Sequence, residues 1–230
     1  MKITGRLIYG FLIGVLMFSS VSCNNRPRKE CATFEEMKDP TSDTLSDWSN
    51  VKRGLHASFI SIDEKLPKSV APEIEPVKSV KVAGWKGEKV SAQIVLWTTE
   101  EIRQVECEFN DFMGKGSTLP ASIAQARFVR YVTTDEFGPG CGHRKPGDFP
   151  ASLAPDMLDN LECFNLEAKS VRPVWLTFSI PADAIAGNYK GKVKIHARNQ
   201  PTRDFEIELE VVDQQLPPPS EWRYHLDLWQ

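Results

Sequence analysis

From Leu55 onward, short runs of β-branched and aromatic residues alternate with turn residues. Runs of this kind, bounded by Gly, Pro and Asn, are typical of β-strands. Trp85–Glu88 has the composition of a turn, and six strands are predicted around and after it: Lys89–Thr98, Ile102–Asn110, Ala126–Thr134, Pro173–Ile180, Tyr189–Arg198 and Arg203–Asp213. Because the strands follow one another closely and helical periodicity is almost absent, we expect an all-β fold, an antiparallel β-sandwich.

The last two predicted strands alternate in a way that restricts how they can pair. In both, the inward apolar side chains fall on odd numbers. Opposed residues of an antiparallel pair share a face, so their numbers must add to an even value. The simplest loop is Gln200–Thr202. It predicts the pairs Arg198–Asp204, His196–Glu206, Lys194–Glu208 and Lys192–Glu210, each worth under about 1 kcal/mol but together opposing a slip in register.

A long segment, from Asp135 to about Ser170, interrupts the strand pattern with many Gly and Pro residues. Loops of this length inside a domain are usually functional or disordered. Its apolar side chains predict an excursion that packs against the domain: Phe137, Phe149, Leu153, Met157, Leu158, Leu161 and Phe164. The alternative is that the segment only covers an edge of the sandwich.

The N-terminus, residues 1–22, has the pattern of an export signal. Lys2 and Arg6 precede the apolar run Leu7–Phe18, which is too short to span a bilayer. The following Ser20-Val21-Ser22-Cys23 resembles a bacterial lipobox, although Leu is usual where Ser20 stands. The resemblance implies that Cys23 is acylated and anchors the protein in the cell envelope, most simply at the outer membrane. An ordinary secretory signal is the alternative.

Four regions are expected in all. After the signal peptide, residues 23–50 are polar and broken by Pro27 and Pro40, which predicts a flexible tether. Residues 51–216 form the sandwich domain. Residues 217–230 form a proline-rich joint and a final strand.

The formal net charge of −3 provides no basic surface for nucleic acid, so the only membrane contact expected is the lipid anchor. Besides Cys23 there are four cysteines, Cys31, Cys107, Cys141 and Cys163, too few for a disulfide scaffold. One disulfide hypothesis joins Cys141 to Cys163 across the excursion. Only Cys141 and His143 place two soft metal ligands close together, so neither a metal site nor another cofactor is expected.

Several segments together resemble the N-terminal domain of glycoside hydrolase family 123, whose characterised members are β-N-acetylgalactosaminidases. They are Gly84–Gln93, Cys141–Arg144, Arg172–Trp175 and Ile180–Gly191, and the end of the chain, Tyr224–Gln230, resembles the start of that family's catalytic barrel. The resemblance implies a β-sandwich followed by a (β/α)₈ barrel. It also implies substrate-assisted cleavage, in which the sugar's acetamido oxygen attacks the anomeric carbon while an adjacent Asp-Glu pair assists.

We assign no catalytic residue within this chain. The family's Asp-Glu pair lies on a barrel strand, whereas Asp63-Glu64 and Asp135-Glu136 fall within the sandwich segment. Neighbouring residues of a strand point to opposite faces, so such a dipeptide is more simply a solvated turn or a strand end. The candidate residues for a sugar pocket or a domain interface are His143, Arg144, His225, Asp227 and Trp229.

The leading functional hypothesis is a non-catalytic sandwich domain from a glycan-degrading lipoprotein, with the glycan bound by a catalytic domain beyond Gln230. One alternative is a stand-alone carbohydrate-binding module that stacks sugars on exposed aromatic residues such as Trp48 or Trp85. The other is a purely structural surface lipoprotein.

Overall fold

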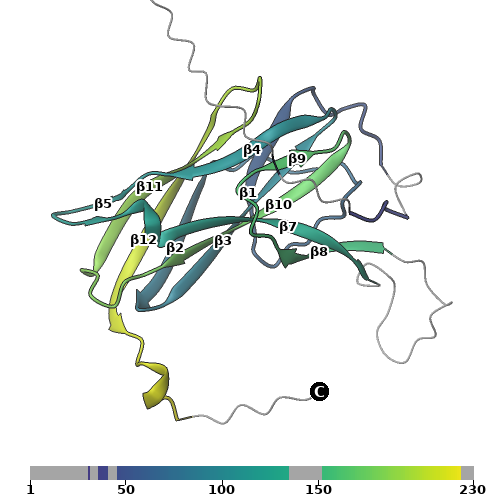
Figure 1. Cartoon of the computed structure of the whole chain (residues 1–230). Helices are drawn as coiled ribbons and strands as arrows, with labels where there is room; N and C mark the ends of the chain where they lie inside the picture. The colour runs from purple at the N-terminus through teal and green to yellow at the C-terminus, as the bar shows by residue number, and fades with distance from the viewer. Residues whose placement is uncertain (1–30, 32–35, 41–45, 135–151, 224–230) are drawn as a thin grey trace, which may run out of the picture.

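The structure, a computed structural model, describes residues 31, 36–40, 46–134 and 152–223, whose strands form two packed sheets (Figure 1). The five-stranded sheet has the order β1 (Leu55–Ile60), β3 (Lys89–Thr98), β10 (Ser170–Ser179), β7 (Ala124–Thr134) and β8 (Ser152–Leu158). The seven-stranded sheet has the order β2 (Ser79–Lys86), β12 (Arg203–Gln215), β11 (Gly187–His196), β4 (Ile102–Phe109) and β9 (Phe164–Leu166). In addition, β5 (Phe112–Gly114) pairs with β11, and β6 (Thr118–Leu119) pairs with β5. The expected all-β sandwich is confirmed.

The remaining regular elements are two short 3₁₀ turns, η1 (Ala121–Ile123) and η2 (Pro219–Glu221). In the portion of the chain that is described, no helix has the length and apolar character needed to cross a membrane. One pairing departs from the antiparallel expectation, because β2 runs parallel to β12. The sequence pattern had marked only the end of β2, as a turn.

The main core lies between the sheets and is filled by the alternating side chains of the long strands. From β12 it receives Phe205, Ile207, Leu209 and Val211, all at most 2% exposed. Gly191 of β11 leaves room for the ring of Phe112, which would lie within 2.4 Å of a Cβ atom at that position. A larger residue there would push Phe112 out of the core, so the glycine is a packing requirement.

Strand β3 is buried on both faces, which explains its unbroken run of apolar residues. Ile94 and Leu96 point into the main core. Val95 and Trp97 point outward into a second cluster with Trp48 and Val171. The outer face of the five-stranded sheet is therefore covered in part by the segment that precedes β1.

The β11–β12 hairpin keeps the predicted parity but not the predicted register. The structure pairs Lys194 with Asp204, Lys192 with Glu206, Lys190 with Glu208 and Asn188 with Glu210. The turn lies earlier than expected because Asn199 adopts the left-handed conformation, with φ of 57°, and the Gln200 amide donates to the Ala197 carbonyl. Asn tolerates that conformation, and Pro201 has no amide to donate.

The excursion contributes an edge strand to each sheet over the part that is described. Strand β8 pairs with β7, and β9 pairs with β4. Leu153 and Phe164 are buried as predicted, whereas Met157 and Leu158 are 48% and 39% exposed. The described part therefore adds edge strands and also packs apolar side chains such as Phe164 into the main core, and residues 135–151 lie outside it.

Candidate functional site: a buried charge cluster that holds the N-terminal segment

The N-terminal segment, meaning the described residues among 31–50, lies against the sandwich. Cys31 is disulfide-bonded to Cys163, with 5.3 Å between the Cα atoms. Trp48 is 7% exposed, and its indole Nε1 donates to the Ser69 carbonyl at 3.0 Å. These contacts differ from the flexible tether expected for this region, because Cys31, the Glu36 side chain and Trp48 are buried against the sandwich.

The disulfide also corrects the sequence-based hypothesis. Cys163 is bonded to Cys31, so it is not available to pair with Cys141, which lies outside the described residues. The correct partner is distant in sequence, by 132 residues, and was assigned to the tether. Spacing along the chain favoured the nearer cysteine, whereas the fold returns the N-terminal segment to the start of β9.

Arg172 creates the need for a buried counter-ion. It lies on the same face of β10 as Val174, Leu176 and Phe178, which point into the main core. Its guanidinium side chain is only 4% exposed. An uncompensated charge in such a place would be strongly destabilising.

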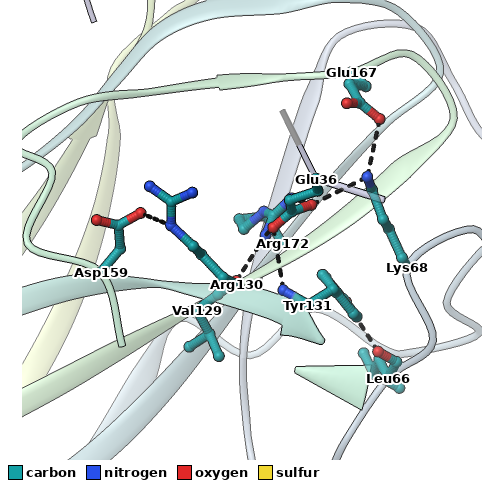
Figure 2. Close-up of polar contacts among 9 residues, drawn as sticks. All are labelled: Glu36, Leu66, Lys68, Val129, Arg130, Tyr131, Asp159, Glu167 and Arg172. Carbon is teal, nitrogen blue, oxygen red and sulfur yellow. Dashed lines mark hydrogen bonds and ion pairs between the residues drawn. The ribbon is translucent and has the colours of Figure 1, made fainter. Parts of the chain in front are cut away.

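Glu36, from the N-terminal segment, provides the compensating charge (Figure 2). Arg172 donates from Nη1 to Oε1 and from Nη2 to Oε2, both at 2.6 Å, which is a bidentate arrangement. The ammonium group of Lys68 lies 3.0 Å from Oε2, and the Tyr131 amide donates to Oε1 at 3.1 Å. The Glu36 side chain is 3% exposed, so four donors from three segments enclose it.

Aromatic rings and carbonyl groups complete the surroundings of Arg172. Its guanidinium carbon lies 4.4 Å from the centre of the Phe164 ring and 5.1 Å from that of Tyr131. Nη1 also donates to the Val129 carbonyl at 2.8 Å. Nearby, Arg130 pairs with Asp159 (Figure 2). Phe164 follows Cys163 directly, so the disulfide and the ion pair fix the same region.

The electrostatics of Glu36 suit structure better than acid–base chemistry. Burial alone would raise its pKa, but the hydrogen bond and charge of Arg172, the charge of Lys68 and the Tyr131 amide outweigh it and lower the pKa from 4.5 to about 2. A general acid in a glycosidase needs a raised pKa so that it holds a proton at neutral pH. Glu36 is instead a permanently ionised partner of Arg172.

This lowered pKa predicts acid sensitivity. The unfolded chain binds a proton at Glu36 near pH 4.5, whereas the folded domain does so only near pH 2. Stability from this group is therefore present above pH 4.5 and is lost as the pH falls toward 2, by about 3 kcal/mol. Urea unfolding between pH 6 and pH 2.5 should show this loss in the wild type and a smaller one in Glu36→Gln. Equal losses would contradict the assignment.

The residues singled out in the sequence are distributed as follows. Cys23, His143, Arg144, His225, Asp227 and Trp229 lie outside the described residues, as do Asp135 and Glu136. Asp63 and Glu64 lie in an exposed turn after β1, where their amides bond to Ser61. That turn fits the expectation of a solvated dipeptide. Trp48 is buried and cannot stack on a sugar, while Trp85 is 44% exposed.

Among the described residues, other candidate sites for metal binding, thiol chemistry or sugar binding have little support. No group of three or more His, Cys, Asp or Glu side chains there could hold a metal ion. The thiol of Cys107 is not disulfide-bonded, and burial, with a smaller effect of Glu106, raises its pKa to about 12. A groove of about 400 Å³ on the seven-stranded sheet has no aromatic side chain among its described lining residues, which include Lys81, Asn110 and Glu208.

Sequence reasoning missed the charge cluster. Arg172 was noted only as part of a family-like motif, although a charge within an apolar strand is itself a signal of a buried partner. Glu36 and Lys68 carried no comparable signal, because both lie in polar stretches outside the predicted strands. Their role depends on the path of the N-terminal segment, which alternation cannot reveal.

A clearly similar fold is found among solved structures. A family 123 glycoside hydrolase from Clostridium perfringens, studied for glycolipid glycan hydrolysis, matches with a TM-score of 0.65 and 21% identity over 73% of this chain. The match covers 29% of the length of that enzyme. Two other matches are too dissimilar to support an argument. A PapD-like domain of human CEP192 has a TM-score of 0.35 and 13% identity, covering 82% of this chain and 100% of that domain. The periplasmic chaperone SfaE has a TM-score of 0.33 and 7% identity, covering 63% of this chain and 59% of the chaperone.

No curated protein sequence matches the chain. A sequence model for the glycoside hydrolase 123 N-terminal domain matches residues 59–197, more than half of the 230 residues. The matched region begins in β1 and ends just after β11, so it contains most of both sheets. The chain therefore belongs to the glycoside hydrolase 123 N-terminal domain family.

Proposed function

We propose that this chain is the non-catalytic support domain of an exported, lipid-anchored glycoside hydrolase. In this proposal the catalytic domain follows the sandwich and cleaves β-linked N-acetylgalactosamine by the substrate-assisted retaining mechanism. The observation that carries the proposal is the extent of the structural match: 73% of this chain, which is a sandwich, corresponds to 29% of a family 123 enzyme. The carboxylate enclosed by Arg172 and Lys68, that of Glu36, has a pKa unsuited to proton donation.

The two ends of the sandwich support a role as a rigid connector. The strand β9, which follows Cys163, pairs with β4 near the β11–β12 hairpin. The chain leaves β12 at the opposite end of the seven-stranded sheet, as Figure 1 shows. Strand β12 has 13 residues, which places these ends roughly 40 Å apart. The sandwich would act as a stiff body. It would hold the N-terminal segment, fixed at one end, apart from the domain that follows at the other end.

The anchor at Cys23 would hold the first of these ends close to the membrane. Only seven residues, Asn24 to Glu30, separate Cys23 from the disulfide-bonded Cys31. A chain of that length extends at most about 28 Å. The Cys31–Cys163 disulfide supports an oxidising compartment, in agreement with export.

Activity is tested by comparing residues 24–230 with the same protein followed by its natural downstream sequence. The longer protein should hydrolyse a nitrophenyl β-N-acetylgalactosaminide, and residues 24–230 should not. Positioning the acetamido group and an acid at the leaving oxygen needs a pocket that the downstream domain would supply. Hydrolysis by residues 24–230 alone would overturn the support role, and no hydrolysis by the longer protein would overturn the proposed substrate.

Anchoring is tested by labelling cells with a fatty-acid analogue. The wild type should be labelled and Cys23→Ala should not, because acylation requires that thiol. Cys107→Ala is the matched control, since it removes the buried thiol without touching the lipobox. Equal labelling of wild type and Cys23→Ala would remove the anchor from the proposal.

A further inference from the structure

The outer face of the seven-stranded sheet changes character along its length. Near the hairpin and in the middle it carries a ladder of opposite charges, in which Lys81 contacts Glu208 and Glu210, and Lys192 contacts Asp204 and Glu206. Toward the other end, the outward positions that follow are Ala83, Trp85 and Val212. We call these three residues the exit patch. Ala83 and Trp85 are exposed, and Val212 is partly exposed.

The exit patch lies where the chain leaves the sandwich. Trp85 is paired with Val212 in the register of β2 and β12, three residues before β12 ends at Gln215. The Leu216 amide then donates to the Lys86 carbonyl at 2.8 Å, which ties the departing chain to the end of β2. The last paired residues, Lys86 and Gln215, also end the two strands, and Figure 1 shows the chain leaving β12 toward η2.

The patch is also held in a fixed shape. The Trp85 amide donates to the Glu88 carboxylate at 2.7 Å, and the Gly87 amide donates to the Ile180 carbonyl at 3.0 Å. Lys86 forms an ion pair with Asp213 at 2.6 Å. A 44% exposed Trp on a rigid turn loses little conformational freedom when it is covered, which is typical of residues that contribute most to interfaces.

We infer that the exit patch is the docking surface for the domain that follows the sandwich, with Trp85 as its central contact. This inference rests on the proposed function. The connection is short and stiff, since Pro217–Pro219 follow Leu216 directly. A domain that begins a few residues later is at high effective concentration beside the patch. The patch itself offers mainly apolar area, which suits a protein surface better than a hydroxyl-rich sugar.

Calorimetric unfolding of two proteins tests the inference: residues 24–230, and the same protein with its natural downstream sequence. Trp85→Ser should leave the midpoint of the shorter protein nearly unchanged and lower the sandwich transition of the longer protein by about 4–8 °C. The matched control is Met157→Ser, because Met157 is 48% exposed on β8, at the far edge of the other sheet. Met157→Ser should leave the unfolding midpoint of both proteins unchanged.

Each outcome separates the docking surface from the proposed function. Equal shifts for Trp85→Ser in both proteins would overturn the docking surface, while hydrolysis by the longer protein would still support the proposed function. A shift confined to the longer protein would support docking even without hydrolysis. If N-acetylgalactosamine raises the midpoint of residues 24–230 and Trp85→Ser abolishes that rise, the patch is a sugar platform and the inference is wrong.

Discussion

Replacing Glu36 with Gln is expected to destabilise the oxidised domain by about 3–5 kcal/mol, the usual penalty for leaving one member of a buried ion pair without its partner. Arg172 would keep the Val129 carbonyl and the Phe164 ring but lose two charged hydrogen bonds. Urea unfolding of residues 24–230 measures the loss. Sequence pattern alone would assign Glu36 to a solvated tether and predict almost no effect.

Two further variants make this test specific. Glu167→Gln removes a carboxylate that is 67% exposed and contacts Lys68 at 3.2 Å, so its effect should be below about 1 kcal/mol. Glu36→Leu combined with Arg172→Met removes both charges and should recover much of the stability lost in Glu36→Gln. If Glu36→Gln and Glu167→Gln were equally mild, the buried cluster would not hold the N-terminal segment.

Removing the disulfide by Cys31→Ser is expected to lower the free energy of unfolding by an amount approaching 5 kcal/mol. The bond closes a loop between residues 132 apart, for which the chain-entropy account gives about 5 kcal/mol. Urea unfolding with and without a reductant measures it. The reductant should destabilise the wild type and leave Cys31→Ser unchanged.

The cysteine pairing can be checked independently of stability. Peptide mapping without reduction should recover a Cys31–Cys163 linkage from the wild type and also from Cys141→Ser. Recovery of a Cys141–Cys163 linkage from the wild type would contradict the structure and restore the pairing suggested by sequence spacing.

The six strands expected from the sequence were predictable because the pattern of apolar and polar residues that marks a strand lies within the strand itself. A run of β-branched and aromatic residues located β3 at its observed bounds, and alternation at period two placed Phe205, Ile207 and Leu209 on the inner face. The hairpin partners were missed by four residues, with Lys194 opposite Asp204 and not Glu208, because parity allows several turns and the choice depended on the backbone conformation of Asn199. Strand β2 was missed because its inward positions include Gly84, and because it pairs with a strand more than 100 residues away.

The charge cluster could not be predicted for a different reason. Glu36, Lys68, Tyr131 and Arg172 come from four separate segments, and their meeting depends on tertiary structure. The sequence did contain one clue, the charge of Arg172 in a strand whose other core-facing residues are apolar. The partner of such a charge is identified only when the path of the N-terminal segment is known.

We propose that the sandwich supports catalysis without taking part in it, and Glu36 is the residue at which this role is tested most directly. The measurement is kcat for a nitrophenyl β-N-acetylgalactosaminide, using the protein with its natural downstream sequence and its Glu36→Gln variant. Both are assayed at a temperature at which circular dichroism shows the variant to be folded. If the sandwich has only a support role, kcat should stay within about twofold while the unfolding midpoint falls. A loss of kcat of a hundredfold or more in the folded variant, the scale on which a catalytic acid or base contributes, would contradict it.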